Sequence, residues 1–184
     1  MLRQTARLVS MEELRHPEMQ HLIDLMRETM RDAPGVGLAA PQVGLPIQLA
    51  VIEDRPEYCR DVAPERLAER ERRPVAFHVL INPRIVERSD EQAEFHEGCL
   101  SLGGFTALVK RSTAVTVEYL DQHGSAGRIE ARGWYARILQ HEIDHLNGQL
   151  YIDRMEPRSF SSLENFSRHW KDLSMEQLRA ALSR

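Results

Sequence analysis

Two histidines four residues apart constrain the fold of this chain more than any other feature. His141 and His145 belong to the sequence HEIDH at residues 141–145. On an α-helix, side chains four positions apart project from the same face, so both imidazoles can bind one metal ion. Glu142 lies one position further round the helix, where a carboxylate can exchange protons with a water at the metal. Two imidazoles and a carboxylate are the groups that metal-assisted hydrolysis requires.

A His pair needs a third ligand, and the two cysteines of the chain differ in their suitability. Cys59 lies in a polar, arginine-rich segment, whereas Cys99 follows a glycine in the sequence EGCLS at residues 97–101. A disulfide between them is not expected, because the N-terminal sequence lacks the apolar stretch of a secretory signal. We therefore interpret Cys59 as a free thiol and Cys99 as a candidate ligand.

Composition limits the class of protein. The chain has 184 residues, of which 42% are hydrophobic and 28% charged, values typical of a soluble globular protein. The formal net charge of -4 argues against general binding to DNA. No apolar run is long enough to span a membrane. We expect a single domain over residues 1–184, without membrane attachment.

Hydrophobic periodicity predicts an α+β fold, with small antiparallel sheets packed around a central metal-binding helix and a helical C-terminal tail. The segment 53–74 is charged and is interpreted as a solvated surface excursion with one helical turn. The tail covers residues 155–184. A strand is expected to stop at Asn82 and Pro83, and a turn at residues 121–124 predicts a hairpin. The expected elements are helices at 17–31 and 134–146, and strands at 47–52, 75–81, 108–111, 115–119 and 128–131.

Three separated segments together resemble a known family. The sequences GVGLAAPQ at residues 35–42, EGCLS at 97–101 and HEIDH at 141–145 resemble the three signature motifs of the peptide deformylases, in the family's order. The sequence GF at residues 104–105 and GW at 133–134 are similar to the subgroup that includes the mitochondrial-type enzymes. The chain departs from many bacterial members after the second motif, where it has LGGFT at residues 102–106 in place of a proline and a later basic residue.

The resemblance implies a reaction and a set of roles. Members of the family remove the formyl group from the N-terminal formylmethionine of new polypeptides and release formate. The implied metal is ferrous iron, with Ni²⁺, Co²⁺ or Zn²⁺ also able to occupy the site. The implied partners are formylated nascent peptides at the ribosome. The resemblance, with the missing secretory signal, implies a cytoplasmic location, and the expected state is a monomer or weak dimer. The roles carried over are metal ligation by Cys99, His141 and His145, acid/base catalysis by Glu142, oxyanion binding by Gln42 and the backbone N–H of Leu100, and backbone pairing with the peptide by Gly37 and Gly98.

The methionine side chain of such a substrate needs an apolar slot. Proximity to the motifs and the helix face suggest Val36, Trp134 and Ile138 as its walls, although each also suits the core. Glu97 is expected among the substrate-binding residues. It is also expected to form a structural ion pair with Arg111 behind the site. Asp144 has two readings, orientation of a neighbouring ligand or a charge pair at the helix surface.

Three alternatives stay open. A zinc peptidase shares the helix pattern but takes its third ligand downstream, where His169 is the candidate imidazole. A metal-stabilised binding protein would close the fourth metal position with another ligand, His78 or His96, but would need neither Glu142 nor Gln42. A deformylase-like paralogue that acts on a specialised small substrate would keep all of these residues.

Overall fold

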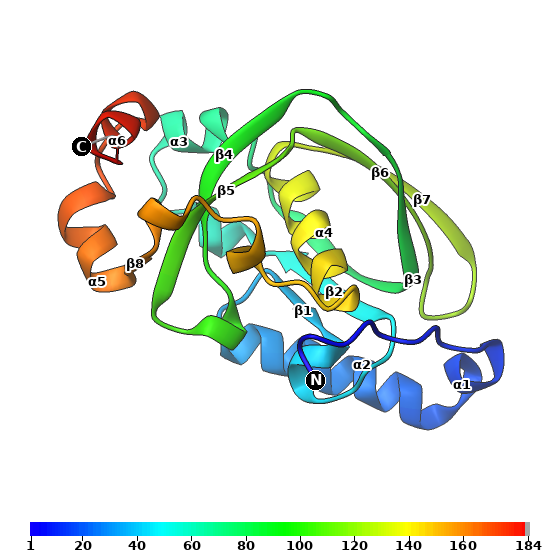
Figure 1. Cartoon of the computed structure of the whole chain (residues 1–184). Helices are drawn as coiled ribbons and strands as arrows, with labels where there is room; N and C mark the ends of the chain where they lie inside the picture. The colour runs from blue at the N-terminus through cyan, green and yellow to red at the C-terminus, as the bar shows by residue number, and fades with distance from the viewer. Residues whose placement is uncertain (183–184) are drawn as a thin grey trace. The chain divides into compact units, whose positions relative to one another are not determined.

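The computed structural model describes residues 1–182, and the last two residues of the predicted tail lie outside this range. The chain divides into two compact units. The first comprises Met1–Gln92 and Arg111–Leu150, and the second comprises Ala93–Lys110 and the chain from Tyr151 onward. Helices and antiparallel strands both occur (Figure 1), so the predicted α+β class is confirmed.

The first unit is built on one five-stranded antiparallel sheet with strand order β1-β2-β3-β6-β7. β1 is therefore an edge strand. The predicted hairpin is present, because β6 and β7 pair along their whole length. The elements are α1 (Met11–Arg15), α2 (Pro17–Asp32), β1 (Gly37–Ala39), β2 (Leu49–Asp54), α3 (Pro64–Glu69), β3 (Val75–Arg88), β6 (Ala114–Leu120), β7 (Ala126–Arg132) and α4 (Gly133–Leu146), with 3₁₀ helices at Ala40–Val43 and Pro56–Cys59.

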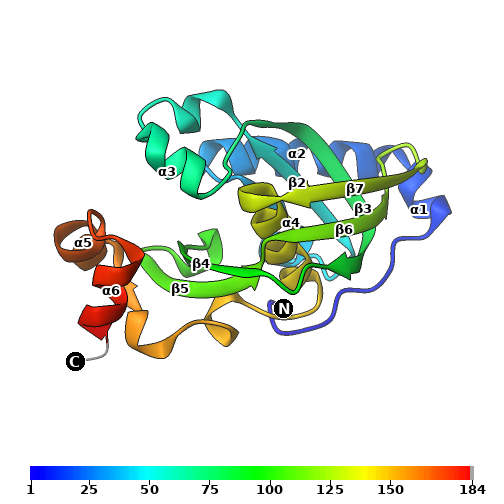
Figure 2. The same cartoon turned by 90° about the horizontal axis from the view of Figure 1, so that it is seen from above.

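Helices α4 and α2 cover opposite faces of this sheet (Figures 1 and 2). Side chains alternate along a strand, so Ala50 and Ile52 of β2 pack with α4 while Leu49 and Val51 pack with α2. All four are fully buried. β2 is thus buried on both faces, which fixes its register.

Helix α2 follows the prediction from apolar spacing. Pro17 occupies the first turn, and the His16 side chain accepts a hydrogen bond from the Glu18 N–H. The apolar stripe includes Met26 and Met30, whose exposed fractions are 1% and 0%. Burial of one such side chain contributes about 1.5–3 kcal/mol, so the methionines serve the core.

The predicted end of a strand at Asn82 and Pro83 is wrong, because β3 continues to Arg88. The register shifts between Ile81 and Arg84, and Asn82 has a φ of 51°. Asparagine tolerates this left-handed conformation, and the bulge accommodates a proline that has no N–H. The two breaker residues therefore bend the strand without ending it.

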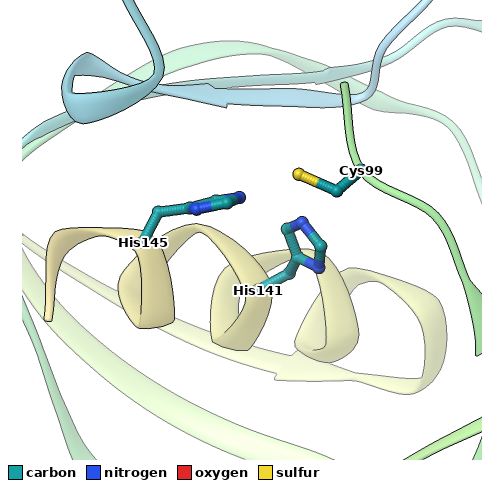
Figure 3. A group of neighbouring side chains, drawn as sticks. All are labelled: Cys99, His141 and His145. Carbon is teal, nitrogen blue, oxygen red and sulfur yellow. The ribbon is translucent and has the colours of Figure 1, made fainter. Parts of the chain in front are cut away.

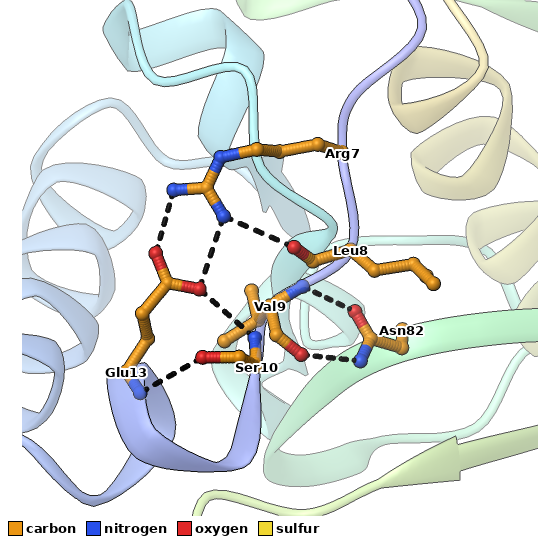
Figure 4. Close-up of polar contacts among 6 residues, drawn as sticks. All are labelled: Arg7, Leu8, Val9, Ser10, Glu13 and Asn82. Atoms are coloured by element: carbon orange, nitrogen blue, oxygen red, sulfur yellow. Dashed lines mark hydrogen bonds and ion pairs between the residues drawn. The ribbon is translucent and has the colours of Figure 1, made fainter.

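The Asn82 side chain also fixes the N-terminal segment (Figure 4). Its carbonyl oxygen accepts a 2.8 Å hydrogen bond from the Val9 N–H, and its amide donates a 2.9 Å bond to the Val9 carbonyl. Next to this contact, Arg7 forms an ion pair with Glu13, and Ser10 caps α1 in a capping box with the same glutamate. The segment before α1 is thereby held along the sheet.

The charged segment 53–74 is only partly solvated. Asp54 has an exposed fraction of 0%, and Arg72 donates two 2.8 Å hydrogen bonds to its carboxylate. This buried ion pair joins the two ends of the segment. The interpretation of this segment as a solvated face is therefore wrong for Asp54 and Arg72. These two charged residues form the ion pair that anchors the segment.

The second unit contains a three-stranded sheet with order β4-β5-β8. β4 was not predicted, since its sequence is polar, and β5 is longer than the predicted strand at 108–111. Ala107, Val109 and Tyr151 form the unit's buried centre. Its elements are β4 (Gln92–Glu97), β5 (Phe105–Ser112), β8 (Ser161–Ser162), α5 (Leu163–Asn165) and α6 (Met175–Leu182), with 3₁₀ helices at Leu100–Leu102, Tyr151–Asp153 and Pro157–Ser159 and a π-helix at Phe166–Trp170. Among residues 1–182, no helix is long and apolar enough to cross a membrane.

Candidate metal and catalytic site

Helix α4 carries the HEIDH sequence and is held mainly by burial. Leu139, Ile143 and Leu146 pack in the core cluster that joins the helix to the sheet. The helix ends at Leu146 with Asn147 as its C-cap, and Gly148 follows with a φ of 72°, a usual glycine position after a helix. The core contacts thus hold the helix along its length.

His141 and His145 project from α4 toward the Cys99 thiol (Figure 3). The candidate ligand atoms of these three residues all lie within 4.8 Å of one another. Zinc-class ions bind such ligands at about 2.0–2.3 Å, so the group is compact enough for one ion. One thiolate and two imidazoles suit several divalent ions and leave a fourth position for a substrate or water. The donor set therefore fits the predicted metal centre.

Glu142 is buried, with an exposed fraction of 3%. Gly37 of β1 lies directly against its side chain. A Cβ added to Gly37 would come within 2.5 Å of the Glu142 Cδ and 2.8 Å of its Cγ. Real Cβ atoms do not approach other heavy atoms so closely, so the absence of a side chain at Gly37 makes the room that this carboxylate occupies.

Gln42 lies in the 3₁₀ helix after β1. Its side-chain oxygen accepts a 2.8 Å hydrogen bond from the Ala39 N–H. This bond fixes the orientation of the side chain, so that the amide NH₂, the donor end, points away from Ala39. A donor is what the predicted oxyanion role requires.

The residues around Cys99 are tied to the start of β5. Glu97 is buried, and its carbonyl accepts a 2.8 Å hydrogen bond from the Thr106 hydroxyl. Gly98 and Leu100 are exposed. Tyr151 is packed near this segment, and burial, together with negative charge at Cys99 and Glu97, raises its pKa to about 12. Tyr151 is thus a neutral neighbour of the thiol that the sequence did not single out.

The three predicted walls of the methionine slot all pack in the core cluster around α4. Ile138 is 4% exposed, while Val36 and Trp134 are partly buried. The Trp134 ring lies beside three guanidinium groups, and their carbon atoms are 5.0, 5.5 and 6.0 Å from its centroid. These groups belong to Arg70, Arg72 and Arg137, none of which was singled out in the sequence. The role of these residues as a slot stays a prediction.

Asp144 is not at the helix surface. Its carboxylate accepts a 2.7 Å hydrogen bond from Arg111, and both side chains are buried. The reading as a surface charge pair is therefore wrong, because the partner comes from β5 and lies in the interior. The predicted pair of Arg111 with Glu97 stays a prediction.

The histidines proposed for other kinds of metal site have different surroundings. Both ring nitrogens of His78 are engaged, with the Ala76 carbonyl and the Tyr135 hydroxyl, each at 2.9 Å. His96 packs against aromatic rings of the tail. Within the described part of the chain, the group of Cys99, His141 and His145 is the one with metal-ligand geometry. Neither a fourth protein ligand nor His169 belongs to it.

The chain is similar to known proteins. The family model described as Polypeptide deformylase matches residues 1–161. The chain is 46% identical over 157 residues to peptide deformylase 1A, chloroplastic, of Solanum lycopersicum, which covers 85% of this chain and 57% of that protein. It is 40% identical over 162 residues to the mitochondrial peptide deformylase of Homo sapiens, with 88% and 67% covered. The chain spans less than two thirds of the first two of the curated relatives, 57% and 61% of their lengths.

A solved structure agrees with the sequence comparisons. The Met-Ala-Ser-bound class I type b peptide deformylase from Acinetobacter baumannii superposes with a TM-score of 0.74 at 36% sequence identity. The match covers 84% of this chain and 91% of that one. Another match, the actinonin complex of a peptide deformylase from Synechococcus elongatus, has a TM-score of 0.68 at 40% identity.

Proposed function

Because the chain belongs to the polypeptide deformylase family, we propose that it removes the N-formyl group from the formylmethionine of newly made polypeptides and releases formate. The observation that carries this proposal is the grouping of Cys99, His141 and His145. Glu142 lies on α4 between the two histidines. A divalent ion bound by the three ligands would supply Lewis-acid chemistry, polarising water and the formyl oxygen.

Glu142 moves the protons of the reaction. A carboxylate beside the metal ligands can accept a proton from the attacking water and return it to the departing amine. Its position is fixed, because the side chain is buried and lies against Gly37. A fixed base needs no reorganisation when the reaction begins, which is the condition for efficient proton transfer.

Gln42 and the Leu100 N–H stabilise the oxyanion that forms when the formyl carbon is attacked. The bond from the Ala39 N–H to the Gln42 oxygen supports this role, because it leaves the amide NH₂ as the outward end. Loss of one such donor typically costs about 3 kcal/mol of transition-state stabilisation. Removal of the Gln42 amide should therefore lower kcat more than it changes substrate affinity.

The peptide binds as an added strand. β1 is the edge of the five-stranded sheet and contains Gly37, and Gly98 is exposed beside the ligand Cys99. An edge strand can supply backbone hydrogen bonds that do not depend on the peptide's sequence. This mode suits an enzyme whose substrates share only the formylmethionine. Val36, Trp134 and Ile138 would line the slot for that methionine, and Glu97 would support the segment that carries Gly98.

The remaining assignments follow from the same family. We propose Fe²⁺ as the physiological metal, with Ni²⁺, Co²⁺ or Zn²⁺ as substitutes, because a thiolate with two imidazoles accepts all of them. We also propose one deformylase-like domain over residues 1–184, a monomer or weak dimer, that acts on nascent peptides at the ribosome in the cytoplasm. Relatives named for chloroplasts and mitochondria make a fractionation experiment the test of location.

The proposed function is tested by formate release from formyl-Met-Ala-Ser by the iron- or nickel-loaded chain. Glu142→Gln keeps the size of the side chain and removes its base, so we expect release to fall at least 100-fold while metal content stays unchanged. Rapid release by the wild type supports the proposal. Absence of release from a fully metal-loaded wild type contradicts it and favours the paralogue with a specialised small substrate.

A further inference from the structure

The C-terminal tail continues past residue 161, where the family match ends, and it contacts the strand that leads to Cys99. It contains α5, the π-helix Phe166–Trp170 and α6. The strand it contacts is β4, which has a neighbour on one side only in the sheet order β4-β5-β8. β4 is therefore an edge strand of this sheet, and the tail supplies it with contacts besides those of its pairing with β5.

Strand alternation separates β4 into two faces. Side chains two positions apart lie on the same face, so Glu94 and His96 share one face and Glu97 shares the other with Cys99. The alternation reaches Cys99 because its backbone is still extended, with φ of -145° and ψ of 139°. The face of Glu94 and His96 is thus the back of the strand that presents the ligand thiol.

The π-helix places two aromatic rings on this back face. The Lys171 N–H donates a 2.8 Å hydrogen bond to the Phe166 carbonyl, five residues earlier, which widens the turn and brings Phe166 and Trp170 to one side. Their ring centroids lie 4.4 Å and 6.2 Å from that of His96. Single π-turns within helices are often found at functional positions.

Helix α6 adds an ion pair to the same face. Arg179 donates hydrogen bonds of 2.7 and 3.2 Å to one oxygen of Glu94. The helix is capped by Ser174, whose hydroxyl accepts a bond from the Gln177 N–H. It is anchored by Leu178, which is 3% exposed. The tail therefore contacts β4 at Glu94 and at His96, the two residues of the back face.

We propose that the C-terminal tail is a positioning element for the metal-ligand thiol, with Phe166, Trp170 and Arg179 as positioning residues. These residues contact the face of β4 that carries Glu94 and His96. Through this contact they hold the C-terminal end of the strand, and therefore Cys99, in the position that binding of one metal ion requires. The proposal rests on the proposed metal-dependent function. Groups that orient a ligand without touching the metal commonly change metal affinity by 10–100-fold when they are lost.

The test compares metal release from full-length variants. Nickel-loaded protein is challenged with excess chelator, and hydrogen exchange of residues 92–99 is followed in the metal-free protein. For the double variant Phe166→Ala and Trp170→Ala we expect release roughly ten-fold faster, at the lower end of that range, and faster exchange in β4. The control is Phe77→Ala, which removes a ring that contacts Arg27 and Arg31 in the first unit; it should leave both readouts unchanged.

A charge reversal gives a second test that does not depend on the aromatic pair. Arg179 is 66% exposed, so its replacement should not impair folding. Arg179→Glu should speed metal release about two- to five-fold, as expected for the loss of a partly exposed ion pair. Combining it with Glu94→Arg should restore the wild-type rate, because the pair re-forms with its charges exchanged. The conservative variant Trp170→Phe keeps an aromatic ring beside His96, so its rate of metal release should stay close to that of the wild type.

The outcomes separate this inference from the proposed function. Equal metal release from the wild type and the double alanine variant overturns the inference, as does equal acceleration by Phe77→Ala or failure of the charge exchange to restore the rate. None of these readouts uses formate. A wild type that binds nickel but releases no formate would contradict the proposed function and still allow the positioning role to be decided.

Discussion

Arg111 and Asp144 form a buried ion pair next to His145, a candidate metal ligand on α4. The Arg111 Nη1 and Asp144 Oδ2 atoms are 2.7 Å apart, and the two side chains are 3% and 8% exposed. Asp144 immediately precedes His145, so within the first unit the pair joins Arg111, near the end of β5, to the turn of α4 that carries a candidate ligand. Two opposite charges in the interior are tolerated only while each keeps its partner.

We expect Arg111→Met to reduce the free energy of unfolding by about 3–5 kcal/mol, because it leaves the Asp144 carboxylate buried without its counter-charge. Urea denaturation of the metal-free protein measures this. The control is Arg84→Met, which breaks an exposed pair with Glu118 and should cost at most about 1 kcal/mol. Similar losses of unfolding free energy from the two substitutions would contradict the expectation that the buried Arg111 pair stabilises the fold more than the exposed Arg84 pair does.

Gly37→Ala should impair catalysis without preventing metal binding. The new Cβ would overlap the Glu142 side chain, and displacement of a catalytic group by about 1 Å commonly costs roughly 100-fold in rate. Formate release and metal content are the measurements. Gly103→Ala is the matched control, since a Cβ there meets nothing within 4 Å. The expectation fails if both alanine variants retain wild-type kcat.

The stability of the fold should fall as the pH drops below about 6.5 because of His78. Burial lowers the pKa of this imidazole from its usual 6.5, so the unfolded chain binds more protons in the window between the two values. The neutral imidazole, bonded to the Tyr135 hydroxyl, therefore contributes stability that is complete above about pH 6.5 and is lost as the pH falls through the lower, folded-state pKa.

Thermal unfolding of the metal-free protein between pH 5 and 8 tests this contribution. His78→Gln removes the titrating group and should flatten the pH dependence in that window. If the melting temperature of the variant depends on pH as steeply as that of the wild type, groups other than His78 cause the acid sensitivity. Metal-free protein is needed because protons would also compete with a metal for the candidate ligands His141 and His145.

Iron-loaded protein should lose activity in air faster than nickel-loaded protein. The group we expect to react is the sulfur of Cys99, the candidate ligand, which oxygen or peroxide can oxidise in steps that end irreversibly. Activity decay in air, with and without a reductant, is the measurement. Cys59→Ser should decay like the wild type, because Cys59 is outside the metal group. Equal decay rates of the two metal forms would contradict this expectation.

Local patterns in the sequence determined the parts of the protein that depend on neighbours along the chain. The spacing of His141 and His145 placed both on one helix face, and apolar periodicity gave α2 within one residue of its observed end. Alternation and a turn sequence identified the β6–β7 hairpin. These features could be predicted because helix and strand periods act over a few residues.

Tertiary structure decided what depends on distant residues. β3 passes through Asn82 and Pro83, and Asn82 bonds Val9, which is far away in the sequence. Asp144 is buried because Arg111 of another element neutralises it. The tail contacts Glu94 and His96 of β4. β4 is polar and has no clear pattern, so the sequence did not predict the strand or the face that carries these two residues. Such contacts follow from the packing of whole elements, for which no short-range period in the sequence exists.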